Sequence, residues 1–198
     1  MPGSAETTSC TRCQTALDLL DHTIDAECRE SLRTVGVIRV TRSGIVSSAR
    51  LMATDIELAG KVVDSKLQVL RQLRIGPGAD FVRGQVQAVD LRVEAGADVR
   101  LRNDAFYRNV EVLGRLDATL YATGTVAVRP GGCLAGTVYA SRLVVDEGAG
   151  LMARPVVGPE SWAETEKKMR ERFSGSASGP GDAEHVVVRS APSAPSNP

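Results

Sequence analysis

The central part of the chain repeats one short pattern of apolar and polar positions. Five glycines recur at intervals of 18 residues: Gly60, Gly78, Gly96, Gly114 and Gly132. Two apolar residues separated by one residue stand just before each glycine, and a further apolar residue follows it by two to four positions. An apolar-x-Ala pair often comes later in the unit. Because alternation directs every second side chain to one face of a strand, each unit predicts two or three very short strands joined by turns.

One such unit is too small to bury its own apolar face, whereas stacked units cover one another with ladders of like residues. The pattern therefore predicts an all-β solenoid of about seven coils over residues 35–158, which at the ~4.8 Å strand spacing makes a rod of roughly 30 Å. A β-sandwich or barrel also has short strands at even intervals and is the alternative. The glycine keeps the same position in five successive units, and this regularity favours the solenoid.

Three further segments flank the repeat. Residues 1–34 hold three of the four cysteines and form a separate N-terminal segment. Residues 159–173 predict a short helix, with acidic residues early and basic residues late, as the helix dipole favours. Residues 174–198 are rich in Ser, Gly, Ala and Pro and are predicted to be disordered, because they cannot bury enough surface to offset the entropy of ordering. Residues 185–188 form an apolar island there, either a strand that adds to a partner or to the rod itself, or an incidental patch.

The repeat resembles that of the bactofilins, which are polymer-forming bacterial cytoskeletal proteins. The stretches LRIGPGADFVRGQVQAVDLRVEAGADV and LYATGTVAVRPGGCLAGTVYASRLVVDEGAGL carry the resemblance, which covers about residues 36–157. It implies a right-handed, three-faced β-helix with flexible tails and end-to-end assembly into filaments without nucleotide. It also implies a scaffold that positions cell-envelope or morphogenetic partners.

The two ends of such a rod are the predicted polymer interface. Terminal coils present unpaired backbone groups and an uncovered apolar core, which together form a template for another copy. Natural solenoids usually cap such ends. The alternative is therefore a monomeric adaptor, in which the cysteine segment caps one end and the 159–173 helix caps the other. The predicted interface residues are Val37, Ile38 and Val40 at the N-terminal end and Leu143, Val145, Leu151 and Val156 at the C-terminal end.

The cysteine segment resembles a degenerate zinc ribbon. Cys10 and Cys13 form a C-x-x-C knuckle, and Cys28 follows Cys13 by fifteen residues. A second knuckle would need a cysteine at position 31, where the chain has Ser31. Tetrahedral zinc needs four ligands, and either His22 or a water molecule can supply the fourth. Two interpretations stay open. The segment is either a structural zinc site with the ligands Cys10, Cys13, Cys28 and His22, or a ribbon that no longer binds metal.

The residues of the repeat argue against an enzyme. A period of 18 is three times six, the period of hexapeptide-repeat acyltransferases, which are the enzyme alternative. That chemistry needs a general base, usually a histidine. Both histidines, His22 and His185, lie outside the repeat, and Gln87 breaks the apolar residue expected every six positions.

Charge and hydropathy restrict the partners and the location. Lys+Arg and Asp+Glu both number 24, so the zero net charge gives no reason to expect nucleic-acid binding, or more than peripheral membrane association. No apolar run approaches the ~18 residues of a membrane span, and the first residues lack the features of a secretory signal. We therefore expect the protein to lie in the cytoplasm, including the inner face of the membrane. In that compartment we expect its cysteines to be free or metal-bound rather than in disulfides.

Overall fold

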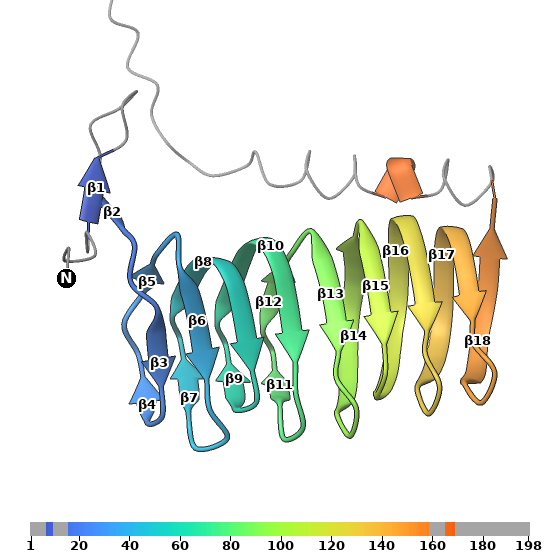
Figure 1. Ribbon diagram of the computed structural model, residues 1–198, viewed down its shortest axis with the longest axis horizontal. Helices are drawn as coiled ribbons and strands as arrows, with labels where there is room; N and C mark the ends of the chain where they lie inside the picture. The colour runs from blue at the N-terminus through green and yellow to red at the C-terminus, as the bar shows by residue number, and fades with distance from the viewer. Residues whose placement is uncertain (1–6, 10–15, 159–164, 169–198) are drawn as a thin grey trace, which may run out of the picture.

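The described residues are nearly all β and wind into a right-handed β-solenoid of about eight turns (Figure 1). The computed structural model describes residues 7–9, 16–158 and 165–168. Apart from one antiparallel hairpin of β1 (Thr7–Ser9) and β2 (Ala16–Asp18), the strands pair in parallel between successive turns. The predicted fold class is confirmed.

Each turn contributes strands to three faces of the rod. The first face contains β3 (His22–Ile24), β6 (Val37–Val40), β13 (Asp90–Val93), β15 (Asn109–Val112) and the last residues of β8 (Arg50–Leu58), β10 (Lys66–Ile75), β16 (Arg115–Val128) and β17 (Cys133–Val145). The second face contains β4 (Glu27–Cys28), β7 (Ile45–Ser47), β9 (Lys61–Val63), β11 (Asp80–Val82) and the first residues of β14 (Asp98–Tyr107), β16, β17 and β18 (Gly150–Val157). The third face contains β5 (Leu32–Arg33), β12 (Gln85–Gln87) and the remaining parts of the long strands.

The core consists of columns of aliphatic side chains that run along the rod axis. One column is formed by residues in register on the first face: Leu58, Ile75, Val93, Val112 and Val128. All of them are buried. Because each fully buried Val, Leu or Ile contributes roughly 1.5–3 kcal/mol, these columns are the main stabilising element of the rod.

Three of the five recurring glycines, Gly60, Gly114 and Gly132, lie where adjacent turns come too close for a side chain. A Cβ atom on Gly60 would lie 2.2 Å from the carbonyl oxygen of Gly44 in the preceding turn. Gly78 instead has a φ of +92°, a backbone conformation that other residues rarely adopt. The glycine repeat thus marks corners of the solenoid for two separate physical reasons.

The stack begins before the predicted boundary at residue 35. Strands β3, β4 and β5 pair with β6, β7 and β8, so residues 22–33 form an additional first turn. His22 lies in register with Ile38 and Cys28 with Val46. The sequence pattern did not reveal this turn, because it has no glycine and because a histidine and a cysteine occupy two positions that are aliphatic in the next turn.

The second and third faces are interrupted in the middle of the rod. Strand β13 continues the first face by pairing with β10. In contrast, β11 and β12 pair only with the turn before them, and β14 pairs only with β16, within the part of the chain that the structure describes. The rod therefore consists of two laddered halves that are joined along one face.

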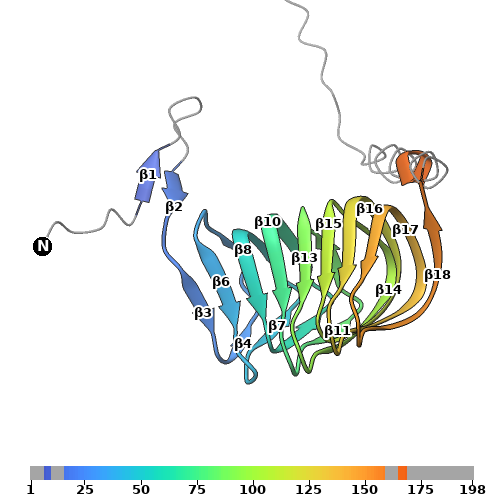
Figure 2. The same ribbon diagram turned by 45° about the vertical axis from the view of Figure 1, so that its right-hand side comes forward.

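Only part of the predicted C-terminal helix falls within the described residues. Residues 165–168 are helical and lie along the flank of the rod near its C-terminal turns (Figures 1 and 2). The rest of 159–173 and the predicted disordered segment 174–198 lie outside the described residues. Among the described residues, no helix is long and apolar enough to span a bilayer.

Candidate assembly surfaces

The C-terminal end exposes side chains that are buried in every preceding turn of the same column. Val145 is 41% exposed, whereas Val128, its partner in the turn beneath, is fully buried. Leu151 is 37% exposed above the fully buried Leu134. The positions are equivalent, so the difference arises because no described strand pairs with the outer edge of residues 142–145 in β17 or with that of β18. This end is an apolar face with a free strand edge.

Of the four interface residues predicted at the C-terminal end, three lie in inward columns of the last turn and one lies on its outer side. Leu143, Val145 and Leu151 belong to inward columns of the last turn. Val156 is in register with Tyr139 and lies on the outer side of β18. Its neighbour Val157 continues the column of the buried Ala140 and is 48% exposed. Alternation alone could not choose between these two valines, because they are adjacent and both apolar.

The predicted N-terminal interface residues are not at the end of the rod. Ile38 and Val40 are buried beneath β3, because the first turn covers them. Val37 pairs with Asp55 and is partly exposed on the outside of the same strand. The true N-terminal edge is formed by β3, β4 and β5.

This N-terminal edge is more polar than the C-terminal end. His22 Nε2 lies 2.6 Å from Asp18 Oδ2, and the backbone N–H of Leu20 donates to the same carboxylate at 2.8 Å. The hydrogen bond from Leu20, and after it the one from His22, lowers the pKa of Asp18 below its ordinary value. The apolar residues of this edge are already covered in part or in full: Ile24 is buried, and Cys28 and Leu32 are partly buried against the core. The two ends therefore differ in chemistry, and the C-terminal end carries more uncovered apolar surface.

Two of the four predicted zinc ligands can be placed. His22 and Cys28 lie in β3 and β4 of the first turn, and Cys28 Sγ is 3.6 Å from the carbonyl oxygen of Glu30. Cys10 and Cys13 lie outside the described residues. Over residues 16–158 and the other described positions, no three His, Cys, Asp or Glu side chains gather as a metal site. The four-ligand site stays a prediction.

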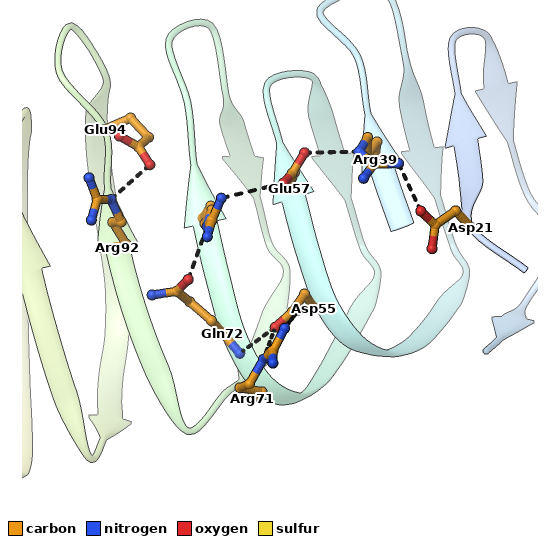
Figure 3. Close-up of polar contacts among 9 residues, drawn as sticks. Asp21, Arg39, Asp55, Glu57, Arg71, Gln72, Arg92 and Glu94 are labelled. Atoms are coloured by element: carbon orange, nitrogen blue, oxygen red, sulfur yellow. Dashed lines mark hydrogen bonds and ion pairs between the residues drawn. The ribbon is translucent and has the colours of Figure 1, made fainter. Parts of the chain in front are cut away.

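The outer side of the first face carries ion pairs that run from turn to turn. The guanidinium of Arg39 donates to Asp21 and to Glu57, both at 3.1 Å (Figure 3). Arg71 donates through two nitrogen atoms to the carboxylate of Asp55, which also accepts the backbone N–H of Gln72 at 3.2 Å. Because basic and acidic side chains are paired here, this flank carries charges of both signs.

The fold and its end faces define the class of the protein as a right-handed β-solenoid whose apolar C-terminal turn pairs with no further strand among the described residues. Comparisons with models of protein families, with curated proteins and with solved structures give no match to this chain. The class therefore rests on the strand pairing and burial described above.

Proposed function

We propose that the protein is a polymer-forming scaffold of the bactofilin kind, whose rods assemble end to end without nucleotide. The observation that supports this most directly is the exposure of Val145, Leu151 and Val157 at positions that are buried one turn earlier. A second copy placed on this end would continue the columns and pair with the free edge of β18. An exposed edge of this kind is a template for strand addition.

The energetics favour assembly only if the contact continues all three faces. Full burial of a Val or Leu contributes roughly 1.5–3 kcal/mol, and the end residues are already partly covered. Each new backbone hydrogen bond adds a net ~1 kcal/mol. Association costs about 4–15 kcal/mol in lost freedom. A few side chains alone are insufficient, whereas apolar burial together with a ladder of strand bonds offsets this cost.

The scaffold role includes partners and a location that the resemblance implies. The partners would be further copies of the chain together with cell-envelope or morphogenetic proteins, and the location would be the cytoplasm or the inner face of the membrane. In this proposal the protein has no catalytic role.

The test is the assembly state of the full chain in the absence of nucleotide. We expect long assemblies by negative-stain electron microscopy and fast-sedimenting material by analytical ultracentrifugation. Leu151→Asp should disperse them, because it places a charge on the end face. The matched control is Leu70→Asp, which changes a 53% exposed leucine at a bend of β10, remote from both ends. Circular dichroism should show that both variants keep their β structure.

Two outcomes would reject the proposal. If the unaltered chain sediments as a monomer at all concentrations, the adaptor alternative takes its place. If it assembles but Leu151→Asp and Leu70→Asp have the same effect, assembly does not use the C-terminal end.

A further inference from the structure

The interruption in the middle of the rod leaves two strand edges and a groove between them. The groove has a volume of about 1050 Å³, just above the ~300–1,000 Å³ range typical of ligand pockets. Strands β11 and β12 line one side and β14 lines the other. The only described helical segment reaches it through Lys168.

The apolar lining of the groove is core that the interruption has uncovered. Phe81 and Val86 are partly exposed, whereas Val62 and Leu67, the residues in register with them in the preceding turn, are fully buried. Leu101 lies on the opposite side and is also only partly buried. A strand placed between the two sides would restore the burial that the rest of the stack has.

Backbone donors point into the groove from β11 and β12. The N–H of Asp80 donates to Gly60 at 3.1 Å, and that of Gln85 donates to Ser65 at 2.9 Å, both in the preceding turn. In a parallel ladder successive residues direct their N–H groups to opposite sides. The N–H groups of Phe81 and Val86 therefore face the groove. Such an edge binds an extended peptide by strand addition.

The charged side chains that line the groove are mostly basic. Four of them are cationic and two are acidic: Arg83, Arg100, Arg102, Lys168, Asp80 and Asp104. Arg83 and Arg100 also pair with Asp64 at 3.3 Å and Asp117 at 3.6 Å. The excess of basic groups favours an occupant that carries acidic residues next to apolar ones.

We infer that this groove binds residues 182–188 of the same chain as an added strand. That segment, DAEHVVV, joins two acidic residues to three valines, which have high strand propensity. Lys168 is the last described residue and already lines the groove. Thirteen residues separate it from Asp182 and, at about 3.3 Å per extended residue, they can reach any part of the groove. Tethering gives the segment an advantage in effective concentration over any free peptide.

The experiment measures hydrogen exchange at the amides of Phe81 and Val86 in the full chain. The Leu151→Asp background keeps end contacts from contributing to protection. We expect Val186→Asp together with Val188→Asp to speed exchange at both amides about fivefold or more, the loss expected for one net hydrogen bond. The matched control, Ala191→Asp together with Ala194→Asp, adds the same charge to the tail outside the segment and should leave exchange unchanged.

A peptide of residues 180–190 added to the double valine variant should restore protection, and the same peptide with both aspartates should not. The inference is overturned if the valine substitutions leave exchange at Phe81 and Val86 unchanged. It is also overturned if the control substitutions have an equal effect, or if protection in the valine variant returns with protein concentration alone, which would identify a second copy as the occupant.

Discussion

The two halves of the rod build the same corner in different ways. Between the second and third faces, the N-terminal half turns sharply at residues with positive φ: Ser48, Asp64 and Arg83, with φ of 52°, 46° and 56°. In the C-terminal half β16 and β17 pass through this position as continuous strands. The inward residues on either side are five positions apart in one half, at Val62 and Leu67, and four in the other, at Leu116 and Leu120.

This difference explains where the strand pairing is interrupted. In the N-terminal half the corner residue bonds to the next turn, as when the Ser48 N–H donates to the carbonyl oxygen of Val63 at 3.0 Å. The turn of β14 has Val99 and Ala105 on either side of its corner, six positions apart, and so matches neither half. Because a ladder propagates only where consecutive corners superpose, the second and third faces cannot continue into it. A regular period on one face does not ensure regularity on the others.

The halves also differ on the outside of the third face. Phe106, Tyr121 and Tyr139 stack in the C-terminal half with ring centroids 4.9 and 4.7 Å apart. The outer positions of the N-terminal half hold Gln68 and Gln87, which are in register. Tyr121 is buried although it points away from the core. Tyr121 is covered on this flank because it is stacked between the rings of Phe106 and Tyr139.

The largest expected contrast is between a laddered leucine and a leucine at the interruption. Leu116→Ala should lower the free energy of unfolding by about 2–5 kcal/mol, because it leaves a cavity in a fully buried column. Leu101→Ala should cost less than about 2 kcal/mol, because its side chain is only partly buried. Urea unfolding measures both in the dispersed Leu151→Asp background that also carries Val186→Asp and Val188→Asp, so that residues 182–188 do not cover Leu101. Equal losses would show that the groove is closed in solution.

A smaller contrast concerns two glycines that both have positive φ. Gly136 has a φ of +101°, and a Cβ there would lie 2.2 Å from the carbonyl oxygen of Ala118. Gly148 has a φ of +79° with open space around it. Alanine at either position costs about 1–2 kcal/mol for the left-handed conformation. Gly136→Ala should cost a further ~1–3 kcal/mol for the overlap. Thermal unfolding checks this, and similar midpoints for the two variants would contradict the close approach of turns in this half.

The smallest expected effect is the pH dependence of the ion pair on the first face. The hydrogen bond from Arg71, supported by the backbone N–H of Gln72, lowers the pKa of Asp55 below its ordinary value. A carboxylate with a lowered pKa stabilises the fold above its unfolded pKa of ~3.9, and this contribution is lost as the pH falls through the folded value. Asp55→Asn should cost at most about 1 kcal/mol at pH 7, because solvent screens the pair.

As the pH falls below about 4 and through the lowered pKa of Asp55, the stabilities of the Asp55→Asn variant and the unaltered chain should progressively converge. Arg71→Gln should remove the same part of the pH dependence, and the double variant should remove no more. Parallel curves of melting temperature against pH for the variant and the unaltered chain would show that the pair has no net effect.

Local pattern was sufficient for the repeating core. Alternation assigned Ile56, Leu58, Leu91 and Val93 to inward columns, and all four are buried. The glycine phase located corners such as Gly60, because a missing Cβ is a property of the residue itself. Flanking composition located a helix in the segment that contains residues 165–168.

The features that the local pattern did not predict depend on how each turn aligns with the next. The first turn places His22 and Cys28 in register with aliphatic residues, which only its pairing with β6 and β7 reveals. Val156 lies outside and Val157 inside because β18 aligns with β17 in that way. The interruption before β14 depends on how one corner superposes on the next. Local sequence determines which side chains alternate, whereas contacts between distant turns determine which of two alternating sets is inside and where the ladder ends.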